Sequence, residues 1–317
     1  MEKLIFMGTP DFAAPVLMAL IGRYEIAAVV TQPDRRARRG RKVEASPVKV
    51  VALAHDLPVL QPPSLRQPDA VAELRALAPD VIVVAAYGQI LPAEVLAIPP
   101  RGCLNVHASL LPSYRGAAPI AAAILAGEDE TGVTIMLMDE GMDTGPILSQ
   151  APCSISPQDT RESLGARLAQ LGVDLLMDTL PRWLAAEDMA NKIEPQPQDH
   201  DQATYCCLIA KEDGLIDWSQ SAIEICRSCR AYCSWPGIYT HWQGKLLKVL
   251  SAEALPQWSG EEEPGQVMAL DEGLAVATGE GALLLGEVQL AGKKALIAEV
   301  FARGQRDFVG SVLGRGE

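Results

Sequence analysis

Apolar runs and amphipathic segments alternate through the first half of the chain, and this alternation limits the possible folds more than any other feature. Residues 81–86 are apolar throughout, as expected for a strand covered on both faces of a parallel sheet. We expect further strands at 3–7, 26–31, 58–60, 103–107 and 133–138, and helices at 11–21, 46–55, 69–77, 116–127 and 160–184. This order predicts an α/β fold with a doubly wound, mostly parallel, Rossmann-like sheet.

The pattern changes beyond residue 188. Residues 189–205 are rich in Pro, Gln and Asp and indicate an extended linker. A helix is expected at 221–232, followed by short strands at 237–242, 245–250, 265–270, 273–277 and 282–288. We therefore predict a first domain at 1–188 and, after the linker, a C-terminal β-barrel domain of the OB-fold-like type at 206–317.

The composition favours a cytoplasmic protein. The seven cysteines are an odd number, which indicates a reducing compartment rather than a disulfide framework. The opening run from Met1 to Met7 is too short for a signal peptide, and no apolar run reaches the ~18 residues of a transmembrane helix. We therefore expect no membrane partner.

Polar residues follow two neighbouring strands of the predicted sheet. Asn105 and His107 are two residues apart in an extended run, so both side chains point to the same face, with Cα atoms roughly 6–7 Å apart. Asp143 follows the next predicted strand. Each residue alone has an ordinary structural explanation, such as a turn or a satisfied buried hydrogen bond. Open α/β sheets bind ligands at the C-terminal ends of their strands, so the convergence of all three predicts a catalytic site.

A dense basic segment lies in a loop between a strand and a helix of the first domain. The whole chain carries a net charge of −13, yet residues 35–42 contain six cations, namely Arg35, Arg36, Arg38, Arg39, Arg41 and Lys42. An acidic body repels a polyanion, so this segment predicts contact with the phosphate backbone of a nucleic acid. The alternatives are a solvated loop and a nuclear-targeting segment, and the second fits poorly inside a compact α/β unit.

Two other patterns are weak. The first turn, Gly8-Thr9-Pro10, lacks the three-glycine spacing of a dinucleotide-binding fingerprint. Cys226, Cys229 and Cys233 have helical spacing, so buried small side chains explain them more simply than a zinc site does. We therefore expect no metal.

Several longer motifs match one known family. They are Phe6-Met7-Gly8-Thr9-Pro10-Asp11-Phe12, Thr31-Gln32-Pro33-Asp34, Ser46-Pro47-Val48-Lys49, Ala85-Ala86-Tyr87-Gly88, Asn105-Val106-His107-Ala108-Ser109-Leu110-Leu111-Pro112, Arg115-Gly116-Ala117-Ala118-Pro119 and Asp143-Thr144-Gly145. On these residues the chain resembles the methionyl-tRNA formyltransferases over nearly its full length. The Asn-x-His and Asp set is common to folate-dependent formyltransferases, whereas the basic loop and Ile216-Asp217-Trp218 are more specific to the tRNA enzymes.

The resemblance implies an activity and a set of site residues. The activity is transfer of a formyl group from 10-formyltetrahydrofolate to the α-amino group of methionine on initiator methionyl-tRNA, by a monomer of formyltransferase fold. Asn105, His107 and Asp143 would be catalytic, and the six cations of residues 35–42 would bind tRNA. The folate site would be bordered by Ser109, Leu110, Leu111 and Pro112.

The chemistry itself calls for these three side chains. Attack of an amine on an N-formyl group forms a tetrahedral oxyanion, which His107 or the Asn105 amide can stabilise while Asp143 accepts a proton. Which group transfers which proton stays open. Two other hypotheses remain: formyl transfer to or from a small molecule, which would not need the basic loop, and a non-catalytic RNA-binding protein on the same scaffold. The intact chemical residues argue against the latter.

Overall fold

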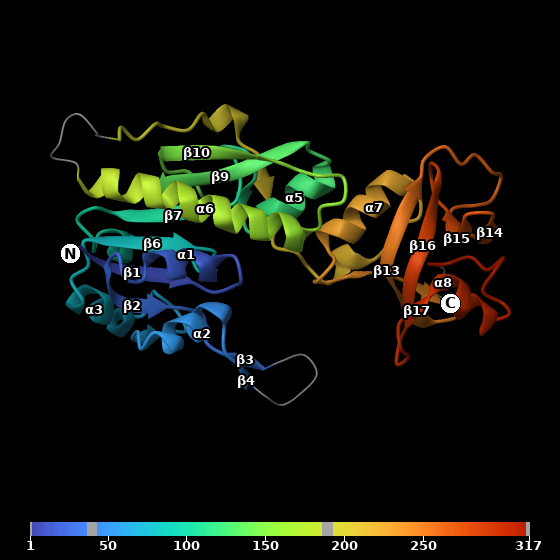
Figure 1. Ribbon diagram of the computed structural model, residues 1–317, viewed down its shortest axis with the longest axis horizontal. Coiled ribbons are helices and arrows are strands. Elements are labelled where there is room, and N and C mark those ends of the chain that lie inside the picture. The colour runs from blue at the N-terminus through green and yellow to red at the C-terminus, as the bar shows by residue number, and fades with distance from the viewer. Residues whose placement is uncertain (1, 37–42, 186–192, 315–317) are drawn as a thin grey trace. The chain divides into compact units, whose positions relative to one another are not determined.

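The computed structural model describes residues 2–36, 43–185 and 193–314 (Figure 1). The chain forms two compact units. The first consists of Met1–Pro119, Glu130–Ser154 and Leu164–Cys207, and the second of Ile120–Asp129, Ile155–Ser163 and Leu208–Glu317. Two segments of the first half of the chain therefore pack with the C-terminal residues.

A seven-stranded sheet forms the centre of the first unit, in the order β10-β9-β7-β6-β1-β2-β5. Its strands are β1 (Lys3–Gly8), β2 (Glu25–Val30), β5 (Val59–Leu60), β6 (Val81–Ala85), β7 (Cys103–His107), β9 (Glu130–Leu137) and β10 (Ile147–Ser154). The five strands from β5 to β7 are parallel, and β9 pairs antiparallel with both β7 and β10. The predicted doubly wound, mostly parallel sheet is confirmed.

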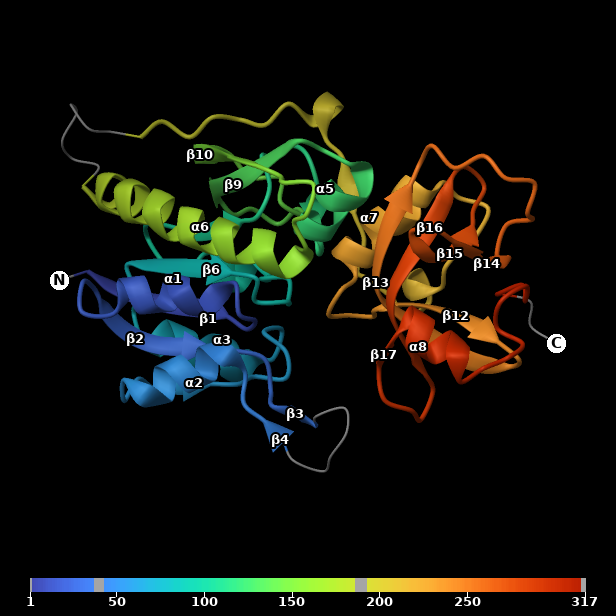
Figure 2. The same ribbon diagram turned by 45° about the vertical axis from the view of Figure 1, so that its right-hand side comes forward.

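Helices cover both faces of this sheet. They are α1 (Ala13–Leu20), α2 (Pro47–Ala54), α3 (Pro68–Ala76), α4 (Ala93–Leu96) and α6 (Arg161–Leu184). Leu74 of α3 and Val95 of α4 pack in one buried cluster with Ile82 and Cys103 of the sheet. Helix α6 crosses the opposite face, where a Cβ atom on Gly172 would lie 2.9 Å from Cγ1 of Val106 (Figures 1 and 2).

The predicted start of α2 at Ser46 and Pro47 is confirmed. The Ser46 hydroxyl accepts a hydrogen bond from the backbone N–H of Lys49 at 3.1 Å, and Pro47 occupies the first helical position of α2. The helix expected from residue 116 instead begins three residues later, as α5 (Pro119–Ala126). The reason is that β8 (Arg115–Gly116) pairs in parallel with β11 (Tyr205–Cys206), which keeps the preceding residues extended.

The second unit is built around an antiparallel sheet in the order β12-β13-β16-β15-β14, with β17 beside β16 (Figure 2). The strands are β12 (Ile238–Trp242), β13 (Lys245–Leu255), β14 (Val267–Leu270), β15 (Gly273–Ala277), β16 (Ala282–Leu290) and β17 (Leu296–Ile297), and the helices are α7 (Ala222–Ala231) and α8 (Ala298–Arg303). A capping box between Ser221 and Glu224 starts α7. The short 3-10 helix η2 (Glu212–Gly214) precedes these elements, whereas η1 (His200–Gln202) belongs to the first unit.

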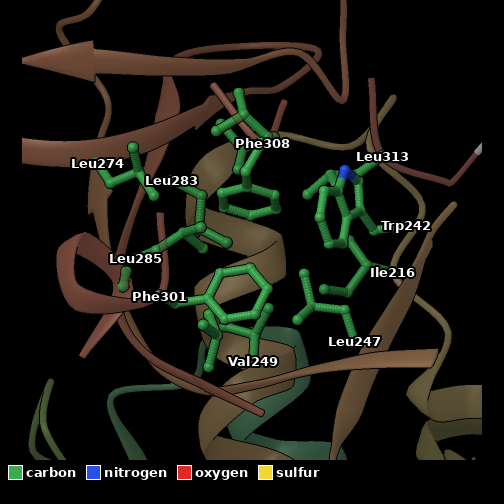
Figure 3. Packing of buried hydrophobic residues seen from close by; sticks show 14 of the residues in the cluster. Ile216, Trp242, Leu247, Val249, Leu274, Leu283, Leu285, Phe301, Phe308 and Leu313 are labelled. Atoms are coloured by element: carbon green, nitrogen blue, oxygen red, sulfur yellow. The ribbon is translucent and has the colours of Figure 1, made fainter. Parts of the chain in front are cut away.

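The core of the second unit is closed by the end of the chain. Trp242, Phe301 and Phe308 meet edge to face with ring centroids 4.9–5.8 Å apart, among buried aliphatic residues (Figure 3). The N–H of Leu313 donates to the carbonyl of Gly265 beside β14, and the N–H of Gly314 donates to that of His241 in β12. Residues 311–314 thus bridge the two outer strands of the sheet, which agrees with the predicted barrel-like domain.

The described part of the expected linker lies along the first unit. The N–H of Gln196 donates to the carbonyl of Ile147 at 2.8 Å, and β11 continues the contact at β8. The boundaries at 188 and 205 stay predictions. Among the described residues, none of the helices combines the length and the apolar composition needed to span a bilayer.

Candidate active site

Strand β7 delivers the first two predicted residues to the edge of the sheet. Asn105 and His107 lie on the same face of β7 and are 8% and 6% exposed, while Val106 between them packs toward α6. This is the consequence of the two-residue period of a strand. Both side chains therefore reach the point where β7 ends, as their spacing predicts.

Asp143 meets both side chains from the loop between β9 and β10. Its Oδ1 accepts a hydrogen bond from Nδ2 of Asn105 at 3.3 Å, and its Oδ2 lies 3.7 Å from Nδ1 of His107. The backbone N–H of Gly116 donates to Oδ2 at 2.9 Å. The three residues selected from the sequence thus come together around one carboxylate.

The loop that carries Asp143 has an unusual backbone. Asp143 adopts φ +53°, in the left-handed region that Asp and Asn tolerate better than most side chains. Two residues later the chain passes so close to β9 that a Cβ atom on Gly145 would lie 1.9 Å from the carbonyl oxygen of Leu137. Glycine at this position therefore lets the loop turn back against the sheet.

His107 has an oxygen near each ring nitrogen. Its Nε2 lies 3.1 Å from the backbone carbonyl of Tyr114, while Nδ1 faces Asp143. A carbonyl only accepts hydrogen bonds, so Nε2 carries a proton in this arrangement. The Asp143 carboxylate, 3.7 Å from Nδ1, is beyond hydrogen-bond distance and is an ion-pair partner for the ring whenever both ring nitrogens carry a proton.

The turn after β7 is held by its own hydrogen bonds. The Ser109 hydroxyl, which is fully buried, donates to the carbonyl of Ser113 at 2.6 Å. The Thr134 hydroxyl donates to the carbonyl of Ser109 and accepts from the N–H of Leu111. Ser109 and Leu111 therefore shape the turn, and Leu110 and Pro112 are the two partly exposed members of the predicted folate-binding set.

Arg115 and Gln198 add a second layer that the sequence did not indicate clearly. Arg115 is 1% exposed, and its Nε and Nη2 donate to Oε1 of Gln198 at 3.1 and 2.7 Å. Nε2 of Gln198 donates in turn to the backbone carbonyls of Asp143 and Gly145. Gln198 lies in the Pro- and Gln-rich stretch that resembles a linker, so no sequence pattern marked it.

The base of the basic segment is ordered by polar contacts. Nζ of Lys49 lies 2.5 Å from Oδ2 of Asp34 and donates to Gln61 at 2.7 Å. The hydrogen bonds from Lys49 and Gln61 hold the pKa of the Asp34 carboxyl below its usual value. β3 (Arg35–Arg36) pairs with β4 (Val43–Glu44) as a short antiparallel ribbon. The other predicted tRNA contacts, Arg38, Arg39, Arg41 and Lys42, lie outside the described residues.

Two of the three cysteines with helical spacing, Cys226 and Cys229, lie in α7 as predicted, whereas Cys233 lies beyond the end of this helix and is exposed, so the prediction of a buried side chain was wrong for it. Cys226 and Cys229 pack against the core of the second unit, and burial raises the pKa of the Cys229 thiol. Within residues 2–36, 43–185 and 193–314, no group of three or more His, Cys, Asp or Glu side chains is arranged to hold a metal ion.

Comparison with known proteins decides the family. The formyl transferase model matches residues 2–180, and the model of the formyl transferase C-terminal domain matches residues 208–306. A methionyl-tRNA formyltransferase of Roseiflexus castenholzii is 48% identical over 98% of this chain and 99% of its own. The chain belongs to the methionyl-tRNA formyltransferase family. A second relative of that name, from Chloroflexus aurantiacus, is 49% identical over 95% of this chain and 96% of its own.

Solved structures of other proteins share the fold. HypX from Aquifex aeolicus, in complex with tetrahydrofolic acid, matches 98% of this chain and 48% of its own length, with a TM-score of 0.65 and 19% identity. An N-formyltransferase from Helicobacter canadensis, in complex with folinic acid and dTDP-3-aminofucose, covers 90% of this chain and 98% of its own, with a TM-score of 0.65 and 20% identity. At 19% and 20% identity, the likeness shows that these two proteins and this chain share a fold.

Proposed function

We propose that this protein transfers the formyl group of 10-formyltetrahydrofolate to the α-amino group of methionine on initiator methionyl-tRNA, as a monomer in the cytoplasm. The observation that carries the proposal is the convergence of Asn105, His107 and Asp143 at one sheet edge. The names of the relatives that align over the full length support the choice of acceptor.

Asp143 is the base in the first step. The unperturbed α-amino group has a pKa of roughly 7.7–8.0, so near neutral pH it must lose one proton before it can attack. The Asp143 carboxylate, fixed by the N–H of Gly116 and by Asn105, accepts that proton directly or through a water molecule. The neutral nitrogen then forms a bond to the formyl carbon.

Asn105 and His107 stabilise the oxyanion that follows. An amide nitrogen carries two N–H groups, and Asp143 takes one of those of Asn105, so the second can donate to the formyl oxygen. Removing one such donor typically slows acyl transfer by about 10²–10³-fold. Collapse of the tetrahedral species breaks the bond between the formyl carbon and the folate nitrogen, and protonated His107 supplies the proton that this nitrogen takes up. The attacking nitrogen, which is positively charged after bond formation, loses its second proton to His107 in exchange, and the proton on Asp143 passes to water.

The two substrates would approach from different elements. The turn of Leu110 and Pro112 borders the end of β7, and its internal hydrogen bonds keep it in place for the folate. The cations of residues 35–42, including Arg38 and Arg41, follow β2 in the sequence, and Asp34 and Lys49 form an ion pair at the start of this segment. Phosphate contacts by such a segment would supply much of the tRNA affinity and make it salt-dependent.

The test is formyl transfer from 10-formyltetrahydrofolate to three acceptors: initiator methionyl-tRNA, elongator methionyl-tRNA and free methionine. Rapid transfer to the initiator alone is expected. Consumption of formyl-folate without formylation of tRNA would instead assign the protein to small-molecule formyl transfer or to hydrolysis. RNA binding without any turnover would overturn the enzymatic proposal altogether.

A further inference from the structure

Arg115 is a buried cation with neutral partners. Beyond its two hydrogen bonds to Gln198, its Nη2 lies 3.2 Å from Nδ1 of His200, and its Nη1 donates to the hydroxyl of Tyr205 at 3.3 Å. Burial of a guanidinium group is costly unless its donors are satisfied. Here the donors of Arg115 are satisfied by Gln198, His200 and Tyr205. The directions of the guanidinium N–H groups in turn fix the orientations of these side chains.

The most strongly oriented of these acceptors is Gln198, which is 7% exposed. A guanidinium group only donates hydrogen bonds, so the side of the Gln198 amide that faces Arg115 must be its oxygen. The amide NH₂ group therefore points the other way. There it donates to the backbone carbonyls of Asp143 at 2.8 Å and of Gly145 at 2.7 Å.

The same short segment holds the other side of Asp143. Gly116, which follows Arg115 in β8, donates its backbone N–H to Oδ2 of Asp143. Strand β8 is in turn paired with β11, where the N–H of Arg115 donates to the carbonyl of Thr204 at 2.9 Å. Gly116 thus holds the carboxylate of Asp143 directly, and Arg115 holds the carbonyl of Asp143 through Gln198.

We propose that Gln198, oriented by Arg115, is a positioning residue that holds the Asp143 loop in its left-handed conformation and so keeps the carboxylate at Asn105 and His107. A non-glycine residue with φ +53° needs its surroundings to maintain that conformation. The two carbonyl contacts of Gln198 bracket the turn from Asp143 to Gly145. This inference rests on the proposed function, because it takes Asp143 to be the base.

Gln198→Glu keeps the contact with Arg115 and removes the hydrogen bonds to the Asp143 loop. A glutamate keeps an acceptor for Arg115 and pairs with it as an ion, so the buried cation stays satisfied. The new carboxylate has no N–H to offer the carbonyls of Asp143 and Gly145. A misplacement of reacting groups by 1 Å can cost about 100-fold in rate, so we expect kcat to fall by roughly 10- to 100-fold.

A purely structural role would give a different result, and three measurements distinguish the two. We expect the KM values for folate and for initiator methionyl-tRNA to stay within about twofold of those of the unmodified protein, and the folate-binding stoichiometry to stay at its original value. The melting temperature should fall through the loss of two hydrogen bonds but stay above the assay temperature. The matched control is Gln196→Glu, because Gln196 is exposed and its side chain hydrogen-bonds only to the carbonyl of Glu194 within the described part of the chain. That variant should keep full activity.

Each alternative outcome has a definite meaning. Normal kcat in Gln198→Glu would overturn the positioning role while leaving the proposed function in place. A loss of activity in Gln198→Glu that matches a loss of folate-binding sites would also overturn the positioning role and leave the proposed function in place. So would an equal loss of activity in the control Gln196→Glu. An unmodified protein that binds folate but does not formylate initiator methionyl-tRNA would overturn the proposed function and this inference with it.

Discussion

Replacement of Asp143 by Asn tests the assigned base with little change in shape. Asn tolerates the left-handed backbone at φ +53°, whereas Ala would lose this local preference. The substitution removes the negative charge and the ability to take up a proton. General-base catalysis is typically worth 10²–10⁴-fold, so we expect kcat to fall by about that factor, or about 3–5 kcal/mol in the barrier.

The substitution should nevertheless leave the protein folded. The Asp143 side chain is 16% exposed and accepts two hydrogen bonds, from Gly116 and from Asn105. Asparagine keeps only one acceptor oxygen, so one of these bonds is weakened, at about 1 kcal/mol, and the other is lost, at about 1–3 kcal/mol. Native proteins are stable by about 5–15 kcal/mol, so Asp143→Asn should remain folded and bind folate normally.

The assay is single-turnover formyl transfer to initiator methionyl-tRNA, with folate binding and thermal unfolding measured on the same samples. Asp139→Asn is the matched control. Asp139 lies in the same loop and also accepts two hydrogen bonds, from Gly141 and Thr144, but it is exposed. A rate for Asp143→Asn within threefold of the unmodified protein, or an equal loss in the control, would refute the role of Asp143 as base.

Three further changes test other parts of the molecule. Joint replacement of Arg38, Arg39 and Arg41 by Ala should raise KM for tRNA. Kinetics at several salt concentrations should also show that the slope of log affinity against log salt concentration becomes shallower by about 0.7–0.9 for each phosphate that is no longer neutralised. Tyr87→Phe should leave stability unchanged or raise it by up to about 1–3 kcal/mol, because the buried Tyr87 hydroxyl has no hydrogen-bond partner among the described residues. Burial raises the pKa of Tyr87 to about 12, so between pH 10 and 12 the unfolded chain loses this proton before the folded protein does, and the free energy of unfolding falls over that range. Urea midpoints of Tyr87→Phe should therefore fall less from pH 10 to 12. Burial also raises the pKa of Cys103 to about 12, so iodoacetamide at pH 8 should modify exposed Cys207 in the native protein and Cys103 only after unfolding, as mass spectrometry can check.

The sequence predicted the features that depend on neighbouring residues. The apolar run at 81–86 became β6, and the spacing of Asn105 and His107 put both on one face, because the period of a strand is a local property. The cap at Ser46 was equally clear, since the capping oxygen and the N–H it accepts from are three residues apart.

Two features that escaped prediction did so for different reasons. Strand β10 was not expected, because it lies at an edge of the sheet, contains Pro152 and exposes alternate residues. Gln198 stands in a stretch whose composition indicates a linker, and its importance comes only from Arg115 and Asp143, which are far away in sequence. Neither partner can be identified from the residues around Gln198.

The closing of the second unit's sheet by residues 311–314 sets an order of events during synthesis on the ribosome. His241 in β12 and Gly314, whose N–H it accepts, are separated by roughly 70 residues, which take about 4–14 s to add at 5–20 residues per second. For that interval the edge of β12 at His241 has no such bridge in the growing chain, and β14 has none for the roughly 45 residues that separate it from Leu313. Unpaired strand edges are where other chains add on. The nascent second unit is therefore most exposed to wrong pairing until residues 311–314 have been made.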